Sequence, residues 1–225
     1  MNFPSALAAA MLSIAGSAQA QKSPDLAPFL IADRAAEVAL ARSAAPKSVS
    51  DSATILVLTR AGLTESIHGT NGFTCAVLRS FDGGLEDPNF WSPKVRAPLC
   101  LNPQATRTML PEIVKRAEWI MTGVSTSEIR DRTQRAYASH EFPMPSAGAM
   151  SYMISHEQYL ADTEPHGWMP HLMFYYDKSM PASSWGASQK SMTIIDGSDG
   201  DPESPITTLF IPVAKWSDGA PALGH

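Results

Sequence analysis

The chain has 225 residues, of which 44% are hydrophobic, and a formal net charge of −5. This length and apolar content suit one domain of ordinary size with a real hydrophobic core. The mild acidity argues against nucleic acid or an anionic membrane as the main partner, and the composition leaves the oligomeric state open.

The first twenty residues, Met1–Ala20, have the pattern of a secretory signal peptide. They contain no charged side chain, carry an alanine-rich apolar run over Ala6–Ala15, and close with the small-x-small motif Ala18-Gln19-Ala20. A run of about ten apolar residues is too short to span a bilayer, and no later segment is long enough, so no membrane span is expected after cleavage. We therefore expect an exported domain of residues 21–225, either periplasmic or secreted. The alternative is that Met1–Ala20 forms an apolar N-terminal helix of the folded domain.

A helix and a central strand are predicted at the start of the mature chain. Ser23-Pro24 places an N-cap residue before a proline at the first helical position, and good helix formers continue to about Arg42. The run Ala53–Thr59 is apolar and β-branched without alternation, which indicates a strand buried on both faces.

A β-meander is predicted, in which the strand Ala53–Thr59 and two further strands are joined by two successive hairpin turns. After a turn at residues 60–62, a second strand is expected over Leu63–His68. Asn71-Gly72 is the dipeptide that favours a type I′ turn, because both central residues of that turn need positive φ. A return strand is therefore expected over Phe73–Ser80.

A long loop without periodicity, Phe81–Leu99, follows these strands. A stretch of this length is unusual inside a compact domain and is often functional. Cys75 lies before the loop and Cys100 lies directly after it, so in an exported protein we expect a disulfide that clamps its base. Closing about 25 residues in this way contributes roughly 3–4 kcal/mol. Two buried free thiols are the alternative.

Two helices are predicted in the middle of the chain. The first begins at Asn102-Pro103, an N-cap followed by proline, or nearer Leu110, and its helical spacing of apolar residues ends at Gly123. The second begins with the capping box Ser125–Glu128 and continues to about Ser139.

The last third of the chain returns to strand patterns, and residues 217–225 are expected to form a flexible tail. Strands grouped on both sides of a helical pair predict an α+β domain with a largely antiparallel sheet. The four candidate strands are Ala149–Ile154, His171–Tyr176, Ser191–Ile195 and Ile206–Val213, and residues 196–205 join the last two as a long hairpin loop.

Histidines and methionines gather between residues 140 and 173. Imidazole and thioether ligands together suit copper, and imidazoles alone suit zinc. No strong ligand spacing such as His-Glu-x-x-His occurs, so the alternative is that these side chains fill the core and bond to loops. The candidate metal ligands are His140, Met144, His166, Met169 and His171.

Aromatic side chains occur near these histidines. Trp91 lies on the long loop, and Trp168, Tyr176 and Trp185 lie in the histidine-rich region. Together they are candidates for the lining of an apolar pocket that binds a small molecule. Ordinary core packing in a strand is the alternative for the alternating aromatics.

No catalytic or nucleotide-binding motif is present in the sequence. It has no Gly-x-Ser-x-Gly, Ser-x-x-Lys, Gly-x-Gly-x-x-Gly or P-loop pattern. The sequence therefore predicts an exported domain that binds a small ligand or a metal ion at the surface formed by residues 140–185, bordered by the long loop. Two alternatives stay open: an envelope hydrolase or redox enzyme whose site forms only in the fold, and a surface domain that binds other proteins.

Overall fold

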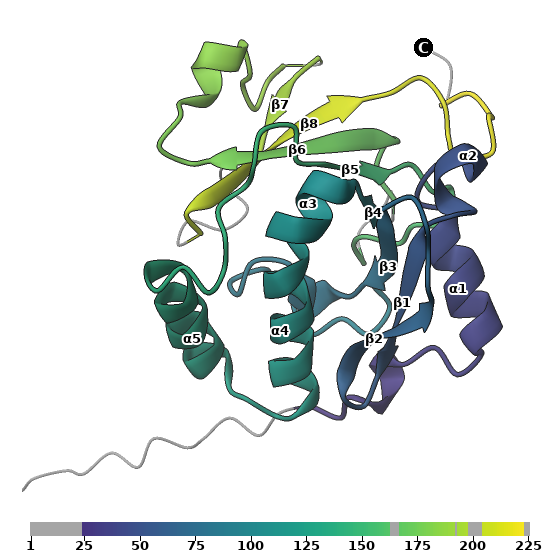
Figure 1. Ribbon diagram of the computed structural model, residues 1–225, viewed down its shortest axis with the longest axis vertical. Coiled ribbons are helices and arrows are strands. Elements are labelled where there is room, and N and C mark those ends of the chain that lie inside the picture. The colour runs from purple at the N-terminus through teal and green to yellow at the C-terminus, as the bar shows by residue number, and fades with distance from the viewer. Residues whose placement is uncertain (1–23, 163–166, 192, 198–203, 223–225) are drawn as a thin grey trace, which may run out of the picture.

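The computed structural model describes residues 24–162, 167–191, 193–197 and 204–222. These residues form an α+β fold, which confirms the predicted class. One eight-stranded sheet has the order β2-β1-β3-β4-β5-β6-β8-β7, with helices packed on both of its faces (Figure 1). Neighbouring strands are antiparallel except β1 and β3, which are parallel. The predicted signal peptide, residues 1–20, lies outside the described residues.

The first α-helix begins later than predicted. A 3₁₀ turn, η1 (Ala27–Phe29), comes first, and α1 (Arg34–Arg42) then begins after Asp33, whose side chain accepts hydrogen bonds from two backbone N–H groups of the first turn. The predicted start at Ser23-Pro24 is wrong because Pro28 would fall inside that helix. Proline has no N–H to donate there, and its ring clashes with the carbonyl four residues earlier.

The hairpin of β1 (Thr54–Thr59) and β2 (Gly62–Ile67) is as predicted, and its turn requires glycine. Gly62 has a φ of +101°, and a Cβ at this position would lie 2.9 Å from the backbone nitrogen and Cα of Glu118. The turn therefore packs directly against the helix that carries Glu118.

The second predicted hairpin is wrong. β3 (Thr74–Leu78) does not pair with β2 but lies parallel to β1 on its other side. Asn71 ties this crossover to α2 (Lys47–Ser50), because its Nδ2 donates to the carbonyl of Val49 at 2.7 Å while its Oδ1 accepts from the backbone N–H of Phe73 at 3.0 Å. β1 thus has a partner strand on each side, which confirms that it is central.

The predicted disulfide is present. Cys75 of β3 and Cys100 of β4 (Ala97–Leu101) face each other across an antiparallel pair and are bonded, and both are fully buried. The predicted loop is shorter than expected, since its first residues belong to the 3₁₀ turn η2 (Ser80–Asp82) and its last three belong to β4. The disulfide joins the two strands from which the loop projects.

The predicted helical pair is divided into three helices: α3 (Pro103–Thr108), α4 (Leu110–Met121) and α5 (Thr126–Ala138). Both starts proposed for the first helix are used, because the helix is interrupted at Met109 and a new helix begins at Leu110. The Asn102 side chain caps α3 and the Ser125 hydroxyl caps α5 by accepting from backbone N–H groups of the first turn, as the sequence predicted.

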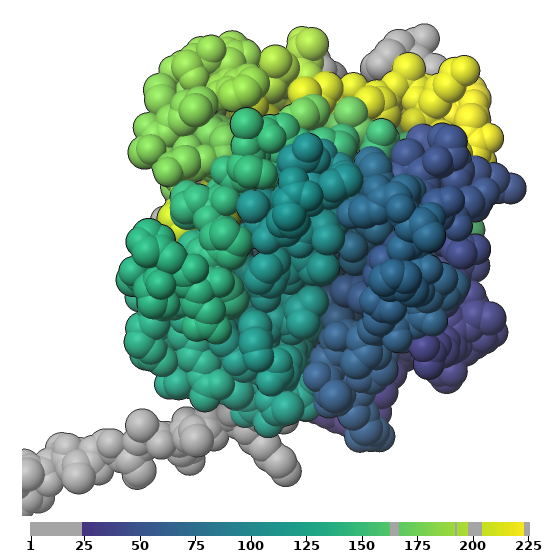
Figure 2. All heavy atoms as spheres, viewed as in Figure 1, coloured from purple at the N-terminus to yellow at the C-terminus, as the bar shows by residue number. Residues whose placement is uncertain are grey.

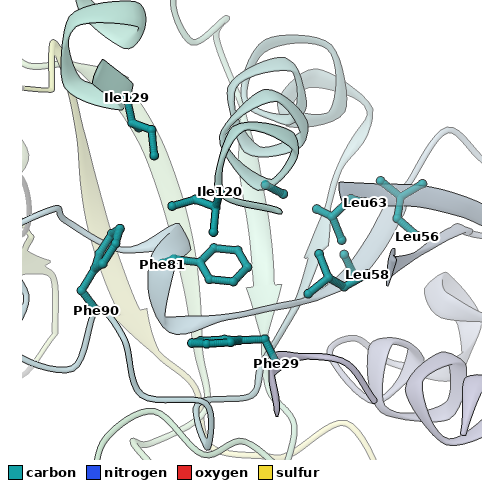
Figure 3. Packing of buried hydrophobic residues seen from close by; sticks show 10 residues of the cluster. Phe29, Leu56, Leu58, Leu63, Phe81, Phe90, Ile120 and Ile129 are labelled. Carbon is teal, nitrogen blue, oxygen red and sulfur yellow. The ribbon is translucent and has the colours of Figure 1, made fainter. Parts of the chain in front are cut away.

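The sheet is covered by helices on both faces over β1, β3 and β4. Leu56 and Leu58 point from β1 toward α4, and the alternating residue Ile55 packs with Ala41 of α1 on the opposite face. In the close view of the α4 side, Phe81 lies between Ile120 and Phe29 (Figure 3).

The C-terminal strands extend this sheet past the helices. They are β5 (Met150–Met153), β6 (His171–Asp177), β8 (Ile206–Pro212) and the short edge strand β7 (Ile195–Asp196), with a 3₁₀ turn η3 (Ala182–Trp185) between β6 and β7. β7 pairs with β8 as predicted, but it contains only Ile195 of the predicted strand Ser191–Ile195 and extends to Asp196, which was predicted to lie in the loop. In the surface view these elements, green to yellow, cover one end of the molecule (Figure 2).

The described part of the predicted tail, residues 217–222, makes backbone hydrogen bonds to other parts of the chain. The backbone N–H of Ser217 donates to the carbonyl of Ile154 at 2.8 Å, and that of Ala222 donates to Ala214 at 2.9 Å. Residues 217–222 are therefore tied to the domain. Among the described residues, no helix has the length and apolar character needed to cross a membrane.

Candidate functional site

A cleft opens on the part of the sheet that extends beyond α4. It consists of two adjoining cavities of about 380 and 290 Å³, which share the lining residues Leu78, Asp82, Gly83, Met173 and Phe210. We call the first the His171 cavity and the second the Arg116 cavity, after a residue that lines each, and the two together the cleft.

The strands form the floor of the cleft. Met173 of β6 and Phe210 of β8 are paired across the sheet, so their side chains share one face. Leu78, Met153, Leu160 and Trp168 add further apolar surface. The loop between β3 and β4 forms the other side through residues 82–95, so the loop that the sequence singled out does border the histidine-rich region.

Asp82, the last residue of η2, is one of three lining residues of the cleft, with Arg116 and Thr207, that have a buried polar atom without a partner in the described residues. Its Oδ2 accepts from the backbone N–H of Arg79 at 2.7 Å, whereas its Oδ1 is buried and has no hydrogen-bond partner within the described chain. Burial raises the pKa of Asp82 to about 6, although the Arg79 hydrogen bond and the nearby guanidinium groups of Arg116 and Arg79 act to lower it. A donor placed against Oδ1 would therefore lower the free energy of this group.

Arg79, whose backbone N–H donates to Asp82, has a side chain that is paired within the protein. Its guanidinium pairs with the buried carboxylate of Glu37 at 2.7 Å, and both side chains are 1% exposed. Arg79 also donates from Nε to the carbonyl of Phe29 and from its third nitrogen to the carbonyl of Val77, and Glu37 accepts from the backbone N–H of Leu58. All three guanidinium nitrogens are thus occupied by protein acceptors.

Arg116 of α4 closes the Arg116 cavity next to Asp82. One terminal nitrogen donates to the carbonyl of Gly83 at 2.7 Å, and the other pairs with Glu112 at 3.5 Å. Its Nε is buried without a partner in the described residues. Glu112 also accepts from the hydroxyl of Tyr137 of α5, so α4 and α5 together fix the charges on this side of the cleft.

His171, the first residue of β6, is 1% exposed. Its Nδ1–H donates to the carbonyl of Met169 at 2.8 Å, and its ring packs against Trp168 and Phe210 with centroid distances of 4.7 and 5.5 Å. Burial lowers the pKa of His171 to about 4, although the Met169 hydrogen bond acts to raise it. His171 is therefore a neutral imidazole at physiological pH.

Tyr175 of β6 supplies a further polar group in the Arg116 cavity. Its hydroxyl is hydrogen-bonded to the Ser151 hydroxyl at 2.8 Å. Burial raises the pKa of Tyr175 to about 12, so the hydroxyl stays protonated and acts as a donor or acceptor for a bound molecule.

The predicted metal ligands occupy different surroundings. His140 is exposed just after α5, at a positive φ of 60°. Met144 packs against a buried apolar cluster with members from β4, α3 and β8, and Met169 offers its carbonyl to His171. His166 lies outside the described residues. In the described ranges no three His, Cys, Asp or Glu side chains come together in a way that could hold a metal ion.

The four predicted pocket aromatics are not brought together. Trp168 lines the His171 cavity. Trp91 packs against Phe90 at a centroid distance of 4.8 Å in the loop, and Tyr176 and Trp185 contact each other at 6.2 Å. Tyr176 alternates with Tyr175 along β6 and so points to the opposite face of the sheet from the cleft.

Two larger surface depressions lack the unpartnered groups of the cleft. One, of about 500 Å³, is lined by Trp119, Arg132 and Arg135 with their neighbours on α5, and both of these arginines pair with Glu128. The other, of about 570 Å³, lies on the loop at residues 85–94. No buried polar atom without a partner belongs to the lining residues of either, within the part of the chain that is described. We therefore regard the cleft as the candidate site.

Asp82 was not predicted from the sequence. Ser80-Phe81-Asp82-Gly83-Gly84 has the composition of an ordinary turn. The only local signal is the spacing of Arg79 and Asp82, which suits a short capped helix. Asp82 shares the Arg116 cavity with Arg116 and with residues of β6 and β8, which lie far away along the chain.

Comparison with known proteins gives no match, whether with family models, with curated proteins or with solved structures.

Proposed function

We propose that the protein binds a small, largely apolar molecule in the cleft, and that this molecule donates a hydrogen bond to Oδ1 of Asp82. The observation that carries the proposal is that Asp82 lines both cavities and that its buried Oδ1 has no partner in the described chain. Sites for small molecules are typically cavities of about 300–1,000 Å³ that combine apolar walls with a few polar groups. The cleft has both properties.

Binding of a neutral apolar dye tests this proposal. We expect N-phenyl-1-naphthylamine to gain fluorescence on binding and to quench Trp168, which lines the His171 cavity. Met173→Trp fills the point where the two cavities meet and should reduce dye affinity by about tenfold or more, equivalent to about 1.4 kcal/mol. Phe174→Trp is the matched control, because this neighbour in β6 points to the other face of the sheet. Equal loss in both variants, with both folded, would contradict the proposal.

Export of the protein is part of the same proposal. It rests on the sequence pattern of Met1–Ala20 and is supported by the Cys75–Cys100 disulfide, because disulfides persist mainly in oxidising compartments. Mass spectrometry of the protein recovered outside the cytoplasm should give an N-terminus at Gln21. Recovery of an uncleaved chain from the cytoplasm only would contradict export.

Acid–base catalysis in the same cleft is a second candidate function. The pKa of Asp82, raised to about 6, suits a group that exchanges a proton near neutral pH. An enzyme of this kind would turn over a member of an ester, peptide or glycoside panel, with a pH–rate profile that changes near pH 6. Asp82→Asn would abolish that turnover, whereas a binding protein would show only stoichiometric binding.

A further inference from the structure

We propose that the ligand of the cleft is an amphipathic amine, whose ammonium group pairs with Asp82 and whose apolar body lies along Met173 and Phe210. This inference rests on the proposed function and names its ligand class. Its first support is the charge of the cleft. The charged side chains that line it, among the described residues, are Asp82, Asp87, Glu112, Arg79 and Arg116.

The basic side chains do not balance the acidic ones. Arg79 is neutralised by its buried partner Glu37, which lies behind the cleft. Arg116 then stands alone against the three carboxylates of Asp82, Asp87 and Glu112. Because His171 is neutral above its lowered pKa, it adds no positive charge at physiological pH. A cationic ligand complements this arrangement and an anionic ligand does not.

The hydrogen-bonding groups favour the same ligand class. Every guanidinium nitrogen of Arg79 donates to a protein acceptor, and the terminal nitrogens of Arg116 do so as well. Among the guanidinium nitrogens of these two arginines, only Nε of Arg116 has no acceptor in the described residues. A carboxylate that paired with Arg116 at two points would therefore have to share a terminal nitrogen that already donates to the protein. Asp82 Oδ1, in contrast, is an acceptor in need of a donor.

Because Asp82 is buried, an ammonium group should bind it more tightly than a neutral hydroxyl does. An alcohol offers one hydrogen bond, whereas an ammonium offers a hydrogen bond and an opposite charge in a site shielded from water. Burial disfavours the ionised form of Asp82, and a paired cation favours it. Amine binding should therefore lower the pKa of Asp82 below its value of about 6 in the free protein.

The test is a comparison of three ligands of equal chain length. Octylamine, octan-1-ol and octanoate are each titrated against wild-type protein carrying N-phenyl-1-naphthylamine at pH 8, and dye displacement is measured. Octylamine should displace the dye at a concentration at least about tenfold below that of octan-1-ol, with octanoate weakest. Asp82→Asn should remove the advantage of the amine over the alcohol.

The matched control is Asp162→Asn. This exposed carboxylate belongs to the loop depression and not to the cleft, and its loss changes the net charge by the same amount. The amine should keep its advantage in this variant. If the amine loses its advantage equally in both variants, the attraction is a general effect of protein charge and the inference is overturned.

The pH dependence gives a second readout. At pH 5 the amine is still charged but Asp82 is largely protonated, so the amine advantage should shrink several-fold. The other charged or titratable groups around Asp82 are Arg79, Arg116, Glu112, Asp87 and His171. Asp82→Asn should show no such change between pH 8 and pH 5.

The outcomes separate this inference from the proposed function. Equal displacement by the amine and the alcohol, or strongest displacement by octanoate, overturns the amine while dye binding in the cleft stands. Failure of the dye to bind, or binding that Met173→Trp does not weaken, overturns the proposed function and the amine with it.

Discussion

Replacing Asp82 with asparagine should stabilise the protein at alkaline pH and not at acidic pH. Burial moves the pKa of this carboxyl group from 3.8 to about 6, and one pKa unit corresponds to about 1.36 kcal/mol, so the penalty for the ionised form is about 3 kcal/mol. A group whose pKa is raised in the folded state contributes stability that is present below pH 3.8 and is lost as the pH rises through 6. The neutral amide avoids this loss.

The expected gain is smaller than the whole penalty. The amide of asparagine places an N–H group where Oδ1 has no partner in the described residues, which costs about 1 kcal/mol. Asp82→Asn should therefore raise the free energy of unfolding by about 2 kcal/mol at pH 8, and lower it by about 1 kcal/mol at pH 3.5.

Urea denaturation followed by tryptophan fluorescence measures both values, with the denaturant slope checked for constancy between variants. Asp87→Asn is the control, because this carboxylate borders the same cleft but is exposed, and its effect should stay within about 0.5 kcal/mol. An Asp82→Asn variant that is no more stable than wild type at pH 8 would refute the view that burial destabilises the ionised carboxylate.

Three further changes test the framework around the cleft. Glu37→Ala should lower the free energy of unfolding by about 3–5 kcal/mol in urea melts, because it leaves the buried Arg79 without its counter-charge. A group whose pKa is lowered by folding contributes stability above its unfolded pKa and loses that contribution in acid. The free energy of unfolding of wild type should therefore fall by up to about 3 kcal/mol as the pH falls from 6.5 to 4, and His171→Gln should remove this fall. Replacing both Cys75 and Cys100 with alanine should cost about 3–4 kcal/mol in thermal or chemical denaturation, because the unfolded chain regains the freedom of the closed loop.

Each of these three has a result that would count against it. A Glu37→Ala variant within about 1 kcal/mol of wild type would mean that Arg79 finds water or another acceptor. An unchanged acid dependence in His171→Gln would mean that the imidazole is not buried as described. A cysteine-free variant as stable as oxidised wild type in the same buffer would contradict the view that the disulfide stabilises the fold by restricting the unfolded chain.

Local sequence patterns gave correct predictions where the structure depends on only a few neighbouring residues. Asn102 and Ser125 cap α3 and α5 as expected, because an N-cap needs only a side chain and the next few backbone N–H groups. Two other local signals failed. Pro28 interrupts the helix expected from Ser23-Pro24, and Asn71-Gly72 forms a crossover between strands that do not pair.

The failure at Asn71-Gly72 has a tertiary cause. The turn residues favour a hairpin, but β1 is buried on both faces and takes a partner on each edge. Pairing β3 with β1 and β4 fills the centre of the sheet and brings Cys75 opposite Cys100. Competition between strands for neighbours is a property of the whole sheet, so no dipeptide signal reports it.

Some features of the candidate site could be predicted from the local sequence, and others depend on residues far apart in the chain. The histidine-rich region and the long loop were identified from composition alone, and both border the cleft. The predicted aromatic set was not assembled, because strand alternation sends Tyr176 to the face opposite the cleft. Asp82 was missed, because a carboxylate becomes unusual only when its surroundings remove water.

The sequence by itself was sufficient for the fold class, most helix and strand positions, and the cysteine pair, since periodicity, capping and spacing act over a few residues. Strand order, the parallel pair of β1 and β3, and the cleft were decided only by the tertiary structure. The physical reason is that burial of Asp82 and His171 arises from segments far apart in the chain. Desolvation by such segments sets their protonation and carries no local sequence pattern.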